Sequence, residues 1–122
     1  VEGAMFEKIP TMSAKEVHDA MERGEIILID VREPGEYAAE RIHGALLFPL
    51  STFDPSALPH DRAQPIVFHC AGGKRSENAM RACLKANIPV RAHMAGGIAA
   101  WKSSGLPTVS IDPDTGAVRD RQ

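Results

Sequence analysis

The chain has 122 residues, of which 43% are hydrophobic and 25% are charged, so it is long enough for one globular domain and too short for two. Its 14 basic and 16 acidic residues form no basic stripe interleaved with aromatic residues, which argues against a nucleic-acid partner. No apolar run approaches the ~20 residues that cross a bilayer, and no secretory signal is visible, so we expect no membrane partner and a cytoplasmic location.

Strand-like and helix-like segments alternate along the chain. Ser13 and Glu16 have the spacing of a capping box, and they predict a helix that Gly24 ends. Residues 26–30 are apolar on both faces, as expected of a buried parallel strand. The other predicted elements are a strand over 6–9, a short helix over 34–37, an apolar run over 45–48, a proline-rich loop over 51–65, a strand over 66–69, a helix over 76–86, a strand over 89–93 and a helical turn around 99–101.

This alternation predicts an α/β fold with a mainly parallel five-stranded sheet and helices on both faces. We place the domain at residues 6–109, interpret residues 1–5 as a cloning remnant or a trimmed N-terminus, and expect residues 110–122 to form a polar tail with a turn over 112–116. Ligands of such sheets bind at the carboxyl ends of the strands, which points to the loop after His69.

That loop combines a cysteine with glycines and cations. Its residues are Cys70, Ala71, Gly72, Gly73, Lys74, Arg75 and Ser76. The two glycines let the backbone curl so that several N–H groups point at one centre, which is an arrangement that binds anions. The N-terminus of the next helix and the charges of Lys74 and Arg75 add positive potential. Because such surroundings favour a reactive thiolate, Cys70 is the candidate nucleophile; the alternative is a buried, inert cysteine before a glycine turn.

Three separated motifs are similar to those of the rhodanese family. The loop matches the family's active-loop pattern at Cys70, Gly73, Arg75 and Ser76. The N-terminal signature is matched at 30–34, 36–37, 42, 44–45 and 49, and the C-terminal signature at 96–101 and 105–107. The resemblance extends from about Ser13 to Pro107. One departure is Glu-Arg-Ile-His-Gly-Ala at 40–45, where many relatives have Gly-His-Ile-Pro-Gly-Ala; we expect it to alter local packing or a partner surface.

The resemblance implies a sulfurtransferase without a cofactor. In such an enzyme the Cys70 thiolate attacks the outer sulfur of thiosulfate or another sulfane donor, and the N–H groups of residues 71–76 hold the resulting persulfide. Lys74 and Arg75 would bind the sulfonate of a small anionic donor. A thiol, a protein thiol or cyanide then accepts the sulfur, which makes the scheme ping-pong.

Two alternatives stay open. Cysteine phosphatases also place a cysteine in an anion-binding loop, but five residues separate their cysteine from their arginine, and here four separate Cys70 from Arg75. A tighter loop suits a sulfur atom better than a tetrahedral phosphate. The second alternative is a persulfide carrier or regulatory binding module within a larger sulfur pathway.

The remaining polar residues favour structural roles. We expect Asp30 to be a turn or capping residue paired with an arginine such as Arg32, and His69 to be a core histidine pointing away from Cys70. Cys83 should be a buried thiol that forms no disulfide. The other histidines, His18, His43, His60 and His93, show no metal-ligand spacing, so we predict no metal. We expect Trp101 to anchor the last helix and residues 96–97 to form a tight turn near the active loop. We also expect the protein to be a monomer.

Overall fold

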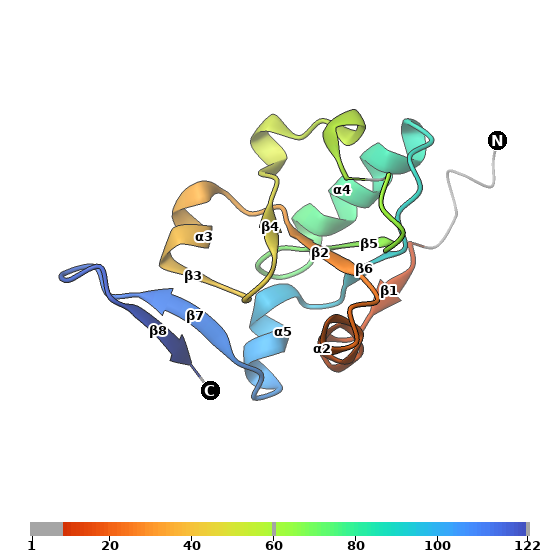
Figure 1. Cartoon of the computed structure of the whole chain (residues 1–122). Coiled ribbons are helices and arrows are strands. Elements are labelled where there is room, and N and C mark those ends of the chain that lie inside the picture. The colour runs from red at the N-terminus through yellow and green to blue at the C-terminus, as the bar shows by residue number, and fades with distance from the viewer. Residues whose placement is uncertain (1–8, 60, 122) are drawn as a thin grey trace.

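A five-stranded parallel sheet forms the centre of the molecule (Figure 1). The computed structural model describes residues 9–59 and 61–121. The strands of this sheet are β1 (Thr11–Met12), β2 (Ile27–Asp30), β4 (Leu46–Leu47), β5 (Ile66–His69) and β6 (Ala92–Met94). Their order is β1-β6-β5-β2-β4, and every neighbouring pair is parallel, which confirms the predicted fold class. The predicted remnant at 1–5 lies outside the described residues, as does the predicted first strand except for Ile9, which is not in a strand.

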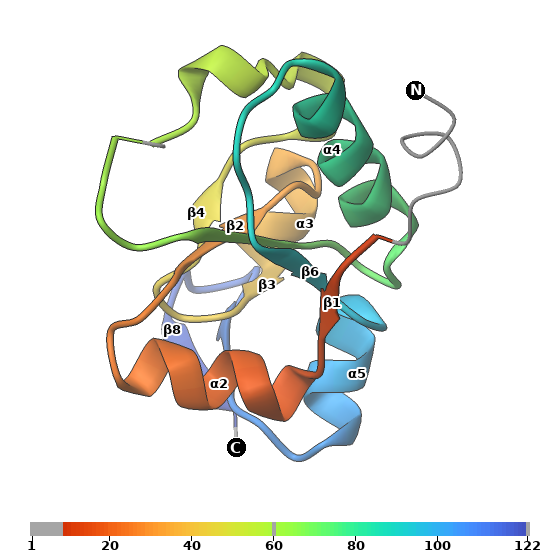
Figure 2. The same ribbon diagram turned by 90° about the vertical axis from the view of Figure 1, so that its right-hand side faces the viewer.

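Helices cover both faces of the sheet (Figures 1 and 2). Helices α2 (Ala14–Glu22) and α5 (Gly97–Ser103) pack on one face, and α4 (Lys74–Lys85) packs on the other. The short helix α3 (Pro34–Ala39) and two 3-10 turns, Leu50–Thr52 and Pro55–Ala57, lie in the connections. The capping box predicted at the start of α2 is present: the Glu16 N–H donates to Ser13 Oγ at 3.1 Å, and the Ser13 N–H donates to Glu16 Oε1 at 2.8 Å.

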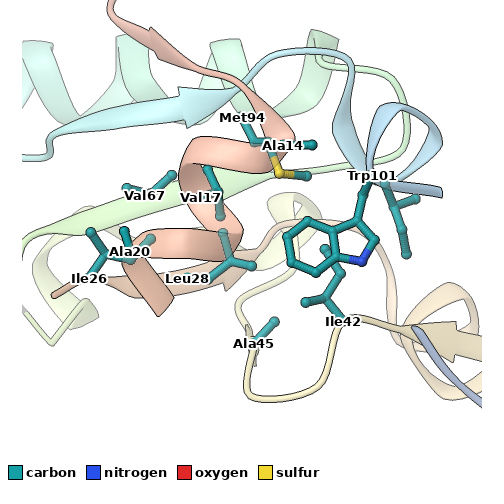
Figure 3. Packing of buried hydrophobic residues seen from close by; sticks show 11 residues of the cluster. Ala14, Val17, Ala20, Ile26, Leu28, Ile42, Ala45, Val67, Met94 and Trp101 are labelled. Atoms are coloured by element: carbon teal, nitrogen blue, oxygen red, sulfur yellow. The ribbon is translucent and has the colours of Figure 1, made fainter. Parts of the chain in front are cut away.

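The strands contribute to two separate cores because successive side chains point to opposite faces. Leu28 packs with Val17 of α2 and Trp101 of α5 on one side (Figure 3). Its neighbour Ile29 packs on the other side with Met80 of α4. Trp101 is 2% exposed and its Nε1–H donates to the Pro107 carbonyl at 2.7 Å, so it anchors α5 as predicted.

Helix α4 departs from its prediction in two ways. It begins at Lys74 rather than at Ser76, because Gly73 takes a left-handed conformation (φ 116°) that turns the chain directly into the helix. The helical spacing of Met80, Cys83 and Leu84 predicts that they share one apolar face, but Leu84 is 44% exposed. The buried stripe of α4 is instead formed by Ser76, Ala79, Met80 and Cys83.

A second, antiparallel sheet lies beside α3 and was not predicted (Figure 1). It contains β3 (Glu40–Arg41), β7 (Thr108–Ile111) and β8 (Val118–Arg121), in the order β3-β7-β8. The residues predicted to be a polar tail therefore form most of a hairpin. The turn predicted over 112–116 is confirmed, and Asp112 Oδ1 accepts the N–H of Asp114 at 2.8 Å within it.

Among the described residues, no helix has both the length and the apolar character that a membrane span requires.

Candidate active site

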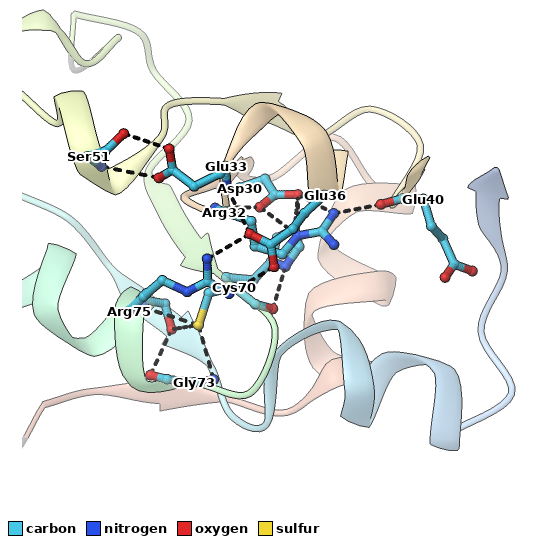
Figure 4. Close-up of polar contacts among 11 residues, drawn as sticks. Asp30, Arg32, Glu33, Glu36, Glu40, Ser51, Cys70, Gly73 and Arg75 are labelled. Carbon is cyan, nitrogen blue, oxygen red and sulfur yellow. Dashed lines mark hydrogen bonds and ion pairs between the residues drawn. The ribbon is translucent and has the colours of Figure 1, made fainter. Parts of the chain in front are cut away.

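Cys70 follows β5 directly, at the carboxyl edge of the parallel sheet (Figure 4). Its side chain is buried, with the residue 1% exposed. Its Sγ accepts the N–H of Gly73 at 3.1 Å and the N–H of Ser76 at 3.3 Å. Ser76 is the third residue of α4, so the sulfur satisfies one of the N–H groups that a helix start leaves without an intrahelical partner. A negatively charged sulfur is stabilised at this position by both hydrogen bonds and by the helix dipole.

Ser76 links the sulfur to a buried histidine. Its Oγ lies 3.6 Å from Cys70 Sγ, 3.1 Å from the Gly73 carbonyl oxygen and 2.7 Å from His93 Nδ1. Burial lowers the pKa of His93, so its imidazole is neutral near pH 7. The single hydroxyl proton of Ser76 can serve only one acceptor at a time. If Nδ1 carries the imidazole proton and donates it to Ser76 Oγ, the hydroxyl proton is available to Gly73 or to the sulfur.

The backbone at the start of α5 packs against the active loop and donates hydrogen bonds to it. The Ile98 N–H donates to the Cys70 carbonyl at 2.8 Å, and the Ala99 N–H donates to the Ala71 carbonyl at 3.2 Å. Gly97 lies directly against this backbone: a Cβ added there would be 2.3 Å from the Cys70 carbonyl oxygen. The tight turn predicted at 96–97 near the active loop is therefore confirmed, and its role is close packing of two backbones.

Arg75 is held by a carboxylate that the sequence analysis did not assign to the site. Arg75 Nη1 donates to Glu36 Oε1 at 2.7 Å, and Nη2 donates to Glu36 Oε2 at 3.0 Å (Figure 4). The Glu33 N–H also donates to Glu36 Oε1, at 2.9 Å. The hydrogen bonds from Arg75 are the main reason that the pKa of Glu36 falls to about 2. Both members of this pair are therefore charged at any pH near neutral.

A buried ion pair between Asp30 and Arg32 lies at the end of β2, where Asp30 is in register with His69 of β5. Asp30 is fully buried and Arg32 is 5% exposed. Arg32 Nη2 donates to Asp30 Oδ2 at 2.8 Å, and Arg32 Nε donates to Asp30 Oδ1 at 3.0 Å. The predicted pairing of these two residues is confirmed. The ion pair connects the end of β2 to the second sheet, because Arg32 Nη2 also donates to the Glu40 carbonyl at 2.7 Å.

His69 is the core histidine that was expected. It is completely buried, and its Nδ1 lies 3.2 Å from the Cys70 carbonyl oxygen, to which it can donate. Its Nε2 lies 3.4 Å from Asp30 Oδ2 but has no partner with hydrogen-bond geometry. Burial lowers the pKa of His69 in spite of the nearby carboxylate of Asp30. A neutral ring that contacts the Cys70 backbone supports the loop and is not placed to act as a base at the sulfur.

We expect the substitution Asp30→Asn to lower the free energy of unfolding by at least about 3 kcal/mol, because it leaves the Arg32 charge buried without its counter-ion. Urea denaturation followed by circular dichroism measures this loss. Glu25→Gln is the matched control: Glu25 pairs with Arg23 at 3.0 Å, but both side chains are more than half exposed, so we expect a loss below about 1 kcal/mol. Equal losses for the two variants would contradict a structural role for the buried pair.

The second cysteine, Cys83, is buried and its thiol is unreactive. Cys83 is fully buried on α4, and burial raises the pKa of its thiol to about 11. Both cysteines are free thiols, as predicted. Within residues 9–59 and 61–121, no three His, Cys, Asp or Glu side chains gather as a metal site would need; His60 lies outside these residues.

The predicted site residues thus fall into three groups. Cys70, Gly73 and Ser76 meet at the sulfur. Ala71 and Gly72 complete the turn between β5 and α4. Lys74 and Arg75 belong to the first turn of α4, where Lys74 is exposed and Arg75 is half-buried.

The sequence analysis did not assign three residues to the site: Glu36, His93 and Gly97. For Gly97 it predicted the turn but not the close contact with the Cys70 backbone. For His93 a signal existed in the sequence, since it ends the strand predicted over 89–93, and the carboxyl ends of parallel strands meet at the edge where Cys70 lies. No local pattern linked Glu36 to Arg75.

Several known proteins are similar to this chain in sequence or in fold. The family model of the rhodanese-like domain matches residues 13–104. An uncharacterised protein of Synechocystis sp. is 38% identical over 99 residues, which are 81% of this chain and 55% of that protein, so the chain spans about half of this relative's length. A sulfurtransferase of Allochromatium vinosum is 33% identical over 88 residues, which are 70% of this chain and 80% of that protein. The solution structure of the rhodanese-like domain of an Anabaena sp. protein has a TM-score of 0.72 at 26% identity, and the match covers 94% of this chain and 90% of that one.

Proposed function

The chain belongs to the rhodanese-like domain family, and we propose that it is a sulfurtransferase that carries sulfane sulfur as a persulfide on Cys70. The observation that carries this proposal is the setting of the Cys70 sulfur. It is buried at a helix start and accepts two backbone N–H groups within 3.3 Å. Such a site stabilises an anionic sulfur. The sulfurtransferase of Allochromatium vinosum, to which the chain is similar, supports the same chemistry.

The proposed reaction has two half-reactions. The Cys70 thiolate attacks the outer sulfur of a donor such as thiosulfate, the S–S bond of the donor breaks, and sulfite leaves with the bonding electron pair. Cys70 then carries a persulfide, whose outer sulfur is held by N–H groups of residues 71–76. A thiol, a protein thiol or cyanide attacks that sulfur, and the Cys70 thiolate is regenerated. No external oxidant or reductant is needed, because each step exchanges one S–S bond for another or, with cyanide, for an S–C bond.

Small anionic donors and thiol acceptors are the partners that this chemistry favours. The positive end of α4 faces the sulfur, and Lys74 lies exposed in the same turn. We also propose a reducing compartment such as the cytoplasm, because both cysteines are free thiols and oxidation of Cys70 would remove the nucleophile.

The proposal is tested by mass spectrometry of the protein after incubation with thiosulfate or with the persulfide of 2-mercaptoethanol. We expect a gain of one sulfur atom, mapped to the peptide that contains Cys70 and removed by cyanide. Cys83→Ser is the matched control. Because Cys83 is buried and burial raises the pKa of its thiol to about 11, this variant should gain the same sulfur and keep most of the activity. If neither donor loads Cys70, or if the sulfur maps to Cys83, the proposal is wrong.

A further inference from the structure

We infer that Glu36 sets the donor class of this site by neutralising Arg75, so that the site disfavours dianionic thiosulfate and favours donors of lower charge, such as alkyl persulfides. The inference rests on the proposed function and concerns the same loop. It assigns Glu36 as a specificity-determining residue, a role that the sequence analysis gave to Lys74 and Arg75 alone.

The Arg75 guanidinium already has a carboxylate partner. Arg75 is one of the two cations expected to bind an anionic donor, but both of its terminal nitrogens donate to Glu36, at 2.7 and 3.0 Å. Glu36 is in turn fixed by the N–H of Glu33 at 2.9 Å, at the start of α3. Bidentate arginine–carboxylate pairs with this geometry are among the strongest charge-assisted contacts. A sulfonate that binds Arg75 must therefore displace Glu36 or share the guanidinium with it.

The charged side chains around the loop balance one another. The charges of Glu36 and Arg75 sum to zero, and so do the charges of the buried Asp30–Arg32 pair. On α4, Glu77 pairs with Arg81 at 2.9 Å. The charges that remain near the loop are Lys74 on α4 and Glu33, whose carboxylate accepts the hydroxyl of Ser51 at 2.6 Å. These eight side chains together carry no net charge. Because these charges balance, the attraction that remains comes from the exposed Lys74, the helix dipole and the backbone N–H groups. The dipole and the N–H groups act on the single reacting sulfur more than on a distant sulfonate.

Glu36 keeps its negative charge at any pH near neutral. The hydrogen bonds from Arg75, followed by the backbone N–H of Glu33, lower the pKa of Glu36 to about 2. Glu36 is therefore anionic at every pH at which Cys70 could react as a thiolate. A dianion that approaches within a few ångströms meets this carboxylate, whereas an alkyl persulfide with at most one negative charge meets half of the repulsion or none.

The reaction with an alkyl persulfide balances without a further reactant. The Cys70 thiolate attacks the outer sulfur of R–S–SH, and the S–S bond of the donor breaks. The electron pair goes to the R–S sulfur, which takes the donor's proton and leaves as R–SH. Cys70 keeps the outer sulfur as an anionic persulfide.

Steady-state kinetics with two donors, thiosulfate and the persulfide of 2-mercaptoethanol, test the inference. In Glu36→Gln the carboxylate charge is removed, and the neutral amide, which can accept only through its single oxygen, holds Arg75 less tightly. We expect kcat/KM for thiosulfate to rise about tenfold and kcat/KM for the alkyl persulfide to change less than about twofold. The gain should shrink as ionic strength rises, because added salt screens the interaction between partly exposed charges.

Three further variants separate charge from packing. Glu36→Asp keeps the charge and should keep the wild-type donor preference. Arg75→Gln, added to Glu36→Gln, should remove the gain, since the gain requires a released guanidinium. Glu25→Gln removes one negative charge at the far end of β2 and should leave both donors unaffected.

The outcomes distinguish the inference from the function it rests on. If neither donor loads Cys70 in the wild type or in Glu36→Gln, the proposed function is wrong. If both donors load Cys70 and Glu36→Gln leaves their ratio unchanged, the role of Glu36 is wrong and the proposed function stands. A gain for thiosulfate that persists at high salt would also overturn the inference, because it would not be electrostatic.

Discussion

Replacing Cys70 by serine is expected to abolish sulfur transfer while the fold and stability stay close to those of the wild type. A serine hydroxyl is a far weaker nucleophile than a thiolate at neutral pH, so no persulfide can form and turnover should fall below detection. The hydroxyl can still accept the N–H groups of Gly73 and Ser76, which the sulfur accepts at 3.1 and 3.3 Å. Sulfurtransferase assays and urea denaturation of the same samples measure both parts of this prediction.

Cys70→Ala separates the two roles of the sulfur. It is equally inactive, but it also leaves two N–H groups in a buried place without their acceptor, which costs about 1–3 kcal/mol for each unsatisfied group. We therefore expect Cys70→Ala to be less stable than Cys70→Ser. Residual sulfur transfer in Cys70→Ser would show that another nucleophile carries the sulfur, and Cys83 would be the first to examine.

The parts of the fold that follow local patterns could be predicted from the sequence. The capping box at Ser13 and the buried strands over 27–30 and 66–69 each depend on residues within one short window. The position of Cys70 follows from the general rule that loops at the carboxyl ends of parallel strands form the site. These elements match the structure because local preference and tertiary packing favour the same conformation.

The contacts that tune the site could not be predicted in this way. Glu36 and Arg75 are 39 positions apart, and Ser76 and His93 are 17 apart. Such pairs depend on how α3, α4 and β6 are placed relative to one another, and a single sequence carries no local signal for that placement. An arginine next to a reactive cysteine therefore predicts a positive site, although its charge is balanced by a carboxylate from another element.

The hairpin of β7 and β8 was missed for a different reason. Its second strand is short and charged, and Val118 in it is 63% exposed. Strands of this kind are formed by pairing with a neighbour rather than by burying an apolar face, so hydrophobic periodicity does not detect them. The neighbour of β8 is β7, which in turn pairs with β3, where Glu40 is in register with Ser110 of β7. The active loop does not depend on this sheet directly, but Arg32 connects the two through the Glu40 carbonyl at 2.7 Å.

The active loop does depend on Gly97, and the substitution Gly97→Ala is expected to damage both stability and activity. A Cβ at this position would lie 2.3 Å from the Cys70 carbonyl oxygen and 2.6 Å from the Ala71 carbonyl carbon, and both are backbone atoms that cannot rotate away. Gly97 also has a left-handed conformation, with φ +60°, which an alanine adopts at a cost of about 1–2 kcal/mol. Relief of the collision requires the loop to move, and this would break the 2.8 Å hydrogen bond from the Ile98 N–H to the Cys70 carbonyl.

Gly105→Ala isolates the effect of the collision from the effect of backbone conformation. Gly105 is also left-handed, with φ +77°, but a Cβ there would meet no atom within 4 Å. This control should lose only the conformational cost, whereas Gly97→Ala should lose a further ~1–3 kcal/mol from overpacking. Gly97→Ala should also lose about 100-fold in sulfurtransferase activity, because displacing the nucleophile by about 1 Å is enough for such a loss. If urea denaturation and kinetics give the same result for both variants, the close approach of the two backbones does not position Cys70, and the loop holds its sulfur through Gly73 and Ser76 alone.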